Sequence, residues 1–213
     1  MLKMILGSDN FPKPNNPSTY GEITTLGTRQ LLQAMDLFAA TKNKEENNND
    51  IHFFDLGSGV GKLVTQVAME LGGGQYDGSN SNSSNNNRSV RTTGVGLSPT
   101  RHEAAERAQE ELRQVFHKKV PKETTGYQFL QDAQNNVKLI QGDLFQVDLS
   151  CATHIYVASL CFPPTLMKAL ETKLIQECTS KNLQYVATLK RFPNDLYPIS
   201  QGSGVYLYRI KQG

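Results

Sequence analysis

The sequence predicts an α/β fold of three layers, in which helices pack on both faces of a mostly parallel sheet. Segments with the apolar pattern of strands alternate along the chain with segments of helical periodicity, which favours right-handed crossovers between parallel strands. Near residue 60 a buried strand runs straight into a glycine-rich turn and then a helix. The 213 residues, 38% of them hydrophobic, are enough for one domain, which we expect to span residues 1–213.

The first strand, the turn and the helix after them are the most informative stretch. Residues 51–54 are apolar and β-prone, as expected for a strand that is covered on both faces. Gly57, Gly59 and Gly61 follow, and glycines allow positive φ angles and let a ligand come close to the backbone. Apolar residues then recur at helical spacing over 60–71. The turn is therefore a candidate cofactor loop.

Three interpretations fit a glycine-rich turn after a strand: a dinucleotide site, an S-adenosylmethionine site, or a plain tight turn. The usual dinucleotide fold has its first glycine directly after the strand and an acid at the end of the second strand. Here an acid, Asp55, precedes the first glycine, and Lys62 does not complete a GxxxxGK[ST] phosphate loop. These two features favour S-adenosylmethionine.

The remaining elements follow in order along the chain. Upstream of the first strand, Leu31, Leu32, Met35 and Leu37 indicate an amphipathic helix. Two polar segments, about 43–50 and 72–89, lack apolar side chains and are predicted to be disordered insertions. Further strands are predicted at 89–97, 136–141, 154–159, 184–189 and 205–210, and further helices at 99–117 and 164–176.

Composition narrows the functional classes. The net charge is +2, and the Lys and Arg residues are spread along the chain, which neither requires nor forbids direct nucleic-acid binding. Cys151, Cys161 and Cys178 have no CxxC spacing and the four histidines are scattered, so we expect no metal and a reducing compartment. No run approaches about 18 apolar residues. We expect a soluble monomer in the cytoplasm or nucleus, with no membrane partner.

Ligands of such sheets bind beyond the carboxyl ends of the strands, so the residues that end each strand are the candidates for the site. Asp143 follows the third strand, where its carboxylate could accept from the exocyclic amine of adenine while Leu144 packs on the ring. The alternative role for Asp143 is a helix N-cap. The other strand ends are Asp55, Gly96-Leu97-Ser98, Ser159-Leu160-Cys161-Phe162 and Lys190-Arg191-Phe192.

Two motifs carry a resemblance to a known family. Residues 20–24 read Y-G-E-I-T, a predicted helix follows, and residues 55–62 read D-L-G-S-G-V-G-K. In this order the motifs resemble the disruptor-of-telomeric-silencing type of histone-lysine methyltransferases, a non-SET family of class I S-adenosylmethionine-dependent enzymes. The resemblance covers roughly residues 18–192. It implies a Rossmann-like class I methyltransferase fold with an antiparallel last strand.

The resemblance also implies roles for particular residues. The Y-G-E-x-T loop and the helix after it, within residues 1–50, should form a lid over the methionine end of the cofactor, and residues 51–213 should form the α/β core. Taken alone, residues 20–24 could instead be a turn with Thr24 or Thr25 as a helix cap. The implied cofactor-binding residues are Tyr20, Gly21, Glu22, Thr24, Asp55, Gly57, Ser58, Gly59, Gly61, Lys62, Ser98, Asp143 and Leu144.

The chain departs from the family pattern in two places. Family members carry an acid that ends the second strand and holds the ribose, where we place Ser98, with Glu103 as a substitute one turn later. Losing a charged hydrogen bond there would lower cofactor affinity about tenfold to hundredfold. The family's paired asparagines after the fourth strand are replaced by Ala158 and Ser159. The second change leaves the identity of the substrate open.

The predicted function is methylation of a protein lysine, histone or non-histone, by in-line attack of a neutral amine on the sulfonium methyl. Apolar and aromatic walls would favour the neutral amine, so no dedicated base is needed. The residues expected to border the reacting groups are Tyr20, Ser159, Phe162 and Phe192, with Tyr197 as a further wall. Alternatives are a small-molecule or nucleic-acid methyltransferase, a dinucleotide-dependent oxidoreductase, and a catalytically weak methyltransferase-like scaffold.

Overall fold

A computed structural model describes residues 23–38, 50–72, 89–178, 182–193, 200–202 and 204–210. Within these residues one seven-stranded sheet has the order β3-β2-β1-β4-β5-β7-β6. The strands are β1 (Ile51–Leu56), β2 (Val90–Gly96), β3 (Val137–Gln141), β4 (His154–Val157), β5 (Tyr185–Thr188), β6 (Ser200–Gly202) and β7 (Val205–Arg209). The five strands β1 to β5 are parallel, while β7 is antiparallel to β5 and to β6. The predicted mostly parallel sheet with an antiparallel last strand is confirmed.

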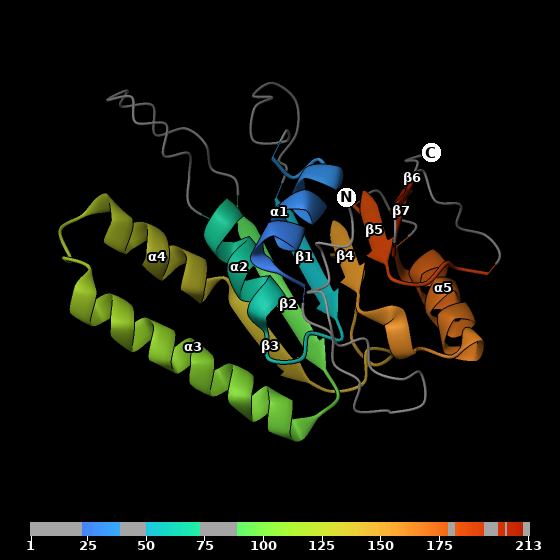
Figure 1. The fold of residues 1–213 in the computed structure, drawn as a ribbon, viewed down its shortest axis with the longest axis horizontal. Helices are drawn as coiled ribbons and strands as arrows, with labels where there is room; N and C mark the ends of the chain where they lie inside the picture. The colour runs from blue at the N-terminus through green and yellow to red at the C-terminus, as the bar shows by residue number, and fades with distance from the viewer. Residues whose placement is uncertain are drawn as a thin grey trace.

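Two apolar clusters lie on opposite faces of the sheet, because neighbouring residues of a strand point to opposite sides. On one face, side chains of α1 (Thr25–Ala34) and α2 (Lys62–Leu71) pack with Phe53 and Tyr156. On the other face, α5 (Pro164–Cys178) packs with Phe54 and Ile155. Figure 1 shows α1 and α2 beside β1 and β2, and α5 beside β5 and β7. The predicted three layers are thus present.

The helix α1 is fixed at both ends. Its N-cap is Thr24, whose hydroxyl accepts from the Gly27 amide at 3.0 Å. After its last turn Asp36 adopts a left-handed φ of 56°, and its carboxylate accepts from the Tyr185 hydroxyl on β5. These contacts hold α1 in a defined place beside the sheet.

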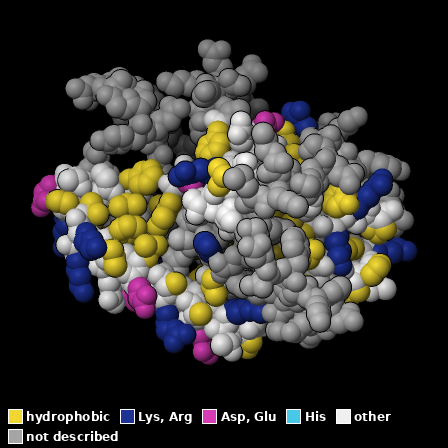
Figure 2. Space-filling view, in the orientation of Figure 1, with side chains coloured by type: hydrophobic (Ala, Val, Ile, Leu, Met, Phe, Trp, Pro, Cys, Tyr) yellow, Lys and Arg dark blue, Asp and Glu magenta, His cyan; other side chains and the backbone are white. Residues whose placement is uncertain are grey.

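The connection between β2 and β3 contains one helix more than the sequence analysis predicted. The predicted helix at 99–117 is α3 (Pro99–Lys119), and a second helix, α4 (Thr125–Asn135), returns beside it. Figure 1 shows this helical pair projecting past the sheet, and Figure 2 shows hydrophobic side chains gathered over α4. The sequence held a signal for α4, since Thr124 caps the Tyr127 amide at 3.2 Å and apolar residues follow at helical spacing.

Other boundaries shift by one to three residues, and two short elements were not predicted, β6 and the 3-10 turn at Ser159–Cys161. The polar insertion predicted at 43–50 lies outside the described residues except Asp50, and that at 72–89 except Gly72 and Ser89. In the described part of the chain no helix has the length and apolar character needed to cross a membrane.

Candidate functional site

The glycine-rich loop joins β1 to α2 at the carboxyl edge of the sheet. Gly57, Gly59 and Gly61 have φ angles of 103°, 55° and 73°, in the left-handed region that favours glycine. The amides of Gly57 and Ser58 both donate to the carbonyl of Val95, at 2.9 and 3.0 Å. The loop therefore bends over the end of β2, and the positive φ angles that the sequence suggested are present.

The loop is packed tightly between β2 and β4. A Cβ atom added at Gly57 would lie 3.2 Å from the Cβ of Ala158, and one added at Gly94 would lie 2.9 Å from the Cβ and Oγ of Ser58. Sequence reasoning missed Gly94, although an isolated glycine inside a strand indicates close approach of another backbone. Ser58 itself is buried against β2. Small residues on three elements thus hold the loop close to the sheet.

Asp55 is the most unusual polar residue of the site. It is the fifth residue of β1, only 3% exposed, and its Oδ1 atom has no hydrogen-bond partner within the described residues. Burial raises the pKa of this carboxyl to about 7. Across the sheet it pairs with Tyr156, whose pKa is also raised by burial and by the Asp55 charge. An unpartnered buried carboxylate is suited to a cationic or donor-rich ligand.

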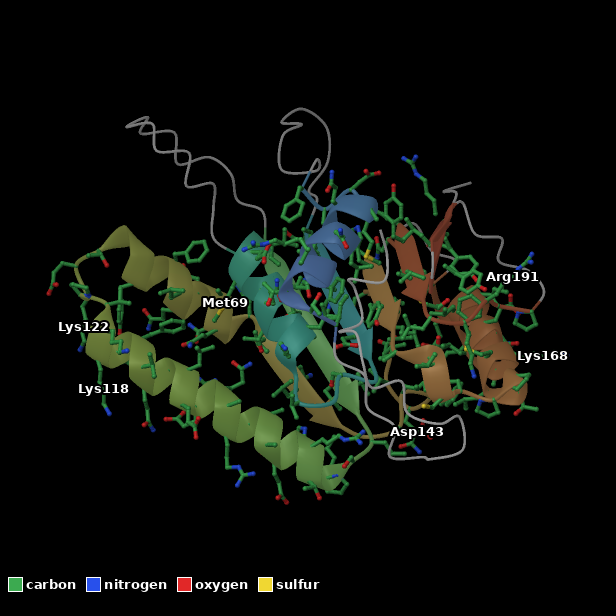
Figure 3. The ribbon with its side chains drawn as sticks, viewed as in Figure 1. Met69, Lys118, Lys122, Asp143, Lys168 and Arg191 are labelled. Carbon is green, nitrogen blue, oxygen red and sulfur yellow. The ribbon has the colours of Figure 1, made fainter. Side chains whose placement is uncertain are left out.

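The ends of β2 and β3 are joined by a hydrogen bond from the Gly142 amide to the Gly96 carbonyl, at 3.0 Å. Leu97 and Asp143 are both exposed beside this bond, and Leu144 is half-buried. Figure 3 shows Asp143 on the loop that leaves β3, at the edge toward which the strand arrows point. An apolar side chain and a carboxylate here are suited to the face and edge of an aromatic base.

Asp143 also has a local structural role. Its Oδ1 atom accepts from the Phe145 amide at 2.9 Å, so it caps a turn where the alternative interpretation had expected a helix cap. Ser98 lies two residues beyond the end of β2, as the N-cap residue of α3, and its side chain makes no capping hydrogen bond. Lys62 is exposed at the first position of α2.

The ends of β4 and β5 are held together by side-chain hydrogen bonds. The Ser159 hydroxyl is fully buried and accepts from the amides of Leu189 and Lys190, both at 3.0 Å. The Lys190 ammonium donates to the Phe162 carbonyl at 2.7 Å. Lys190 was named only as part of a strand end, and its contact with Phe162 could not be read from the sequence. This network fixes the loop that carries Phe162.

The two predicted aromatic residues differ in environment. Phe162 is half-buried and packs against the apolar cluster on the α5 face. Phe192 is 1% exposed; its ring packs on Tyr208 with centroids 5.1 Å apart, and its amide donates to the Tyr208 hydroxyl at 2.9 Å. Phe192 is therefore held inside the apolar cluster, while Phe162 keeps part of its surface exposed.

The predicted lid residues Tyr20, Gly21 and Glu22, and Tyr197, lie outside the described residues. Thr24 is described, as the cap of α1. The start of α1 is tied to α2, since the Gln66 side chain donates to the Thr25 carbonyl at 3.0 Å and Arg29 contacts both carboxylate oxygens of Glu70. The start of α1 therefore lies beside α2, the helix that follows the glycine-rich loop.

The residues present fit S-adenosylmethionine. The Oδ1 atom of Asp55, which has no partner among the described residues, suits its cationic amino-acid end, the glycine-rich loop gives backbone access, and Leu97 with Asp143 suits the adenine. Among the described residues no group of three or more His, Cys, Asp or Glu side chains could hold a metal ion. The site thus offers positions for an organic cofactor along the ends of β1, β2 and β3.

Comparison with known proteins gives a family match over most of the chain. The family model described as "Histone methylation protein DOT1" matches residues 12–204. No curated protein sequence matches the chain.

Solved structures with a similar arrangement include an RNA methyltransferase from Salinibacter ruber in complex with S-adenosyl-L-homocysteine (19% identity, 85% of this chain and 89% of that chain, TM-score 0.48). Another is magnesium protoporphyrin IX methyltransferase from Synechocystis PCC 6803 with bound cofactor (11% identity, 77% of this chain and 57% of that chain, TM-score 0.46). A third is a putative sarcosine dimethylglycine methyltransferase from Galdieria sulphuraria (14% identity, 76% of this chain and 45% of that chain, TM-score 0.43).

Proposed function

The chain belongs to the DOT1 family of histone methylation proteins, and from this membership we propose that it methylates lysine side chains of a protein, histone or non-histone. It is an S-adenosylmethionine-dependent methyltransferase. The observation that carries the assignment to this site is the buried Asp55, whose Oδ1 atom is unpartnered at the glycine-rich loop. An acceptor atom buried without a partner among the described residues is available to a cationic group of a ligand.

The bound cofactor supplies an electrophilic methyl group on a sulfonium. Asp55 would orient the amino-acid end of the cofactor, because a carboxylate that keeps one free oxygen can accept from an ammonium. The glycines of the loop would let the cofactor lie against the backbone. Tyr20, Gly21 and Glu22 would cover it, on the chain that α1 positions.

The acceptor amine must lose a proton before it attacks, since the pKa of free lysine is about 10.4. Two features of the β4 and β5 ends would lower the pKa of a bound ammonium. The walls at Ala158, Leu160 and Phe162 are apolar, which disfavours the charged form, and the Lys190 cation at the Phe162 carbonyl repels it. Ser159 would act as a positioning residue that holds this loop, with Phe192 behind it.

One specific observation favours a second candidate, a catalytically weak methyltransferase-like scaffold. Residues 96–98 at the end of β2 include no carboxylate, and the paired asparagines expected after β4 are Ala158 and Ser159. Small-molecule and nucleic-acid acceptors are alternatives that the acceptor assay separates. We also propose that residues 1–213 act as one monomeric domain in the cytoplasm or nucleus.

The test is transfer of a labelled methyl group to four acceptors presented separately: nucleosomes, a lysine-rich protein extract, total RNA and a small-molecule extract. We expect label in protein, recovered as ε-N-methyllysine after acid hydrolysis, and its loss when acceptor lysines are first acetylated, because an amide nitrogen cannot attack the sulfonium methyl. Asp55→Ala is the inactive control. Label confined to RNA or small molecules would overturn the lysine assignment, and cofactor binding without transfer to any acceptor would favour the scaffold.

A further inference from the structure

The last residue of β2 is Gly96, and its backbone conformation does not require a glycine. Its φ lies outside the left-handed region, and its carbonyl accepts the regular hydrogen bond from Gly142 at the end of β3. In a strand, a glycine without a conformational reason often marks a place that a ligand approaches. Gly96 stands at the edge of the sheet where the glycine-rich loop begins to turn.

A comparison with Gly94, two residues earlier, shows what is unusual about Gly96. A Cβ at Gly94 would lie 2.9 Å from Ser58 Cβ and Oγ and 3.2 Å from Leu139 Cδ2, so packing excludes a side chain there. A Cβ at Gly96 would lie 3.5 Å from Ser58 Oγ and 3.9 Å from the Gly59 amide nitrogen, which are ordinary contacts. A Cβ atom is therefore accommodated at 96 but not at 94.

The direction of that missing side chain is set by the strand. Residues 94 and 96 share one face of the sheet, the face of Asp55, because Asp55 pairs with Gly94 and side chains alternate. A side chain at 96 would therefore point toward Ser58 and Gly59 of the loop. In open α/β sheets that bind nucleosides, an acid at the end of the second strand accepts from the ribose hydroxyls.

We propose that Gly96 makes this site tolerant of changes in the ribose of the cofactor, because β2 presents no charged acceptor to the ribose hydroxyl groups. Ser98 does not take the place of this missing acceptor, because Ser98 lies two residues farther along the chain, as the N-cap of α3. Glu103 is an exposed residue of the same helix. The chain then accepts cofactors whose ribose lacks a hydroxyl or carries a substituent. The inference rests on S-adenosylmethionine as cofactor and is independent of the proposed lysine acceptor.

Calorimetric titration of S-adenosylhomocysteine and its 2′-deoxy and 3′-deoxy analogues tests this proposal. For the unaltered protein we expect the three Kd values to agree within about threefold. Gly96→Glu should bind the parent compound about tenfold to hundredfold tighter, the usual gain from a charged hydrogen bond, and should discriminate against a deoxy analogue by the same factor. Gly96→Gln is the matched uncharged control and should gain less than about threefold.

Two results would overturn the proposal. One is a loss of more than about tenfold for a deoxy analogue in the unaltered protein, which would show that another residue already holds the ribose. The other is a Gly96→Glu protein that melts like the unaltered one but no longer binds, which would show that the cofactor itself fills the space. No binding of any compound by the unaltered protein would instead count against the cofactor assignment, whatever the acceptor.

Discussion

The carboxyl edge of the sheet has two halves, the ends of β1 to β3 and the ends of β4 and β5, which differ in whether their polar groups are hydrogen-bonded. Where β1, β2 and β3 end, Gly96 leaves room for a Cβ atom, and the buried Oδ1 atom of Asp55 has no hydrogen-bond partner in the described part of the chain. Where β4 and β5 end, the polar groups are used: Ser159 accepts two amides and Lys190 donates to the Phe162 carbonyl. The first half is arranged for a ligand, and the second is arranged to keep its own loops in place.

This difference separates residues that bind from residues that position. A group left unsatisfied in the free protein can gain from a ligand, because the cost of its burial has already been met in folding. A group that is fully hydrogen-bonded has little left to offer and acts through the parts it holds. Substitutions in the first half should therefore change cofactor affinity, and those in the second should change stability and turnover.

The largest effect should come from Gly57→Arg. An arginine would have to adopt a φ of 103°, and its Cβ would lie 3.2 Å from the Cβ of Ala158. Left-handed backbone costs about 1–2 kcal/mol for an ordinary residue and overpacking about 1–3 kcal/mol, and the side chain would also occupy the ligand space. We expect calorimetry to show affinity for S-adenosylhomocysteine reduced more than about a hundredfold. Binding within about threefold of the unaltered protein would contradict the assignment of cofactor binding to the ends of β1, β2 and β3.

Asp55→Asn should remove a pH dependence from the stability of the free protein. The folded pKa of Asp55 is about 7, above the ordinary 3.8, so the native state holds this proton more tightly than the unfolded chain. The stability of the free protein therefore falls as pH rises from about 4 to about 7, at up to about 1.4 kcal/mol per pH unit, and this loss should vanish in Asp55→Asn.

The same substitution should weaken cofactor binding about tenfold to hundredfold at pH 8, since a charged acceptor is lost. In the unaltered protein, affinity should rise with pH up to about 7, because the ionised carboxylate is the form that binds a cation. Denaturant unfolding and calorimetry between pH 5 and pH 8 measure both effects. A cofactor affinity independent of pH in the unaltered protein would count against this role for Asp55.

Ser159→Ala should destabilise the protein without changing cofactor affinity. The substitution leaves the amides of Leu189 and Lys190 without their acceptor, at a cost of about 1–3 kcal/mol for a buried group. The matched control is Thr172→Ala, an exposed hydroxyl on α5, which should change stability by less than about 0.5 kcal/mol. A loss of cofactor affinity beyond about threefold in a folded Ser159→Ala protein would place Ser159 in the binding half instead.

The smallest effect is expected for Lys190→Gln. Removing this cation takes away the repulsion that lowers the pKa of an acceptor ammonium, so the pH profile of methyl transfer should move up by less than about one unit. Cofactor affinity should not change. Arg191→Gln is the control, because Arg191 is exposed and lies at the outer side of the molecule in Figure 3. An equal shift in both variants would indicate a general charge effect.

Much of the fold could be predicted because its signals are local. The buried strand at 51–54, the three glycines and the helix after them each depend on neighbours within a few residues, and all three are present. The helix α4 was not predicted, although its N-cap Thr124 and the apolar residues after it are local signals of the same kind. The residues of the lid stay predictions, as they lie outside the described part of the chain.

By itself the sequence determined the α/β class, the glycine-rich loop with its acid, the cofactor and the family resemblance, because composition, periodicity and short motifs carry them. Only the tertiary structure decided which of the named residues lie at the site with hydrogen-bonding capacity left for a ligand. Ser98 lies past the end of β2 while Gly96 ends it, the buried Ser159 hydroxyl accepts from two amides, and the Oδ1 atom of Asp55 has no partner among the residues that the structure describes. Partners of buried polar groups come from strands far apart in sequence, so spacing along the chain cannot reveal which of these groups are satisfied.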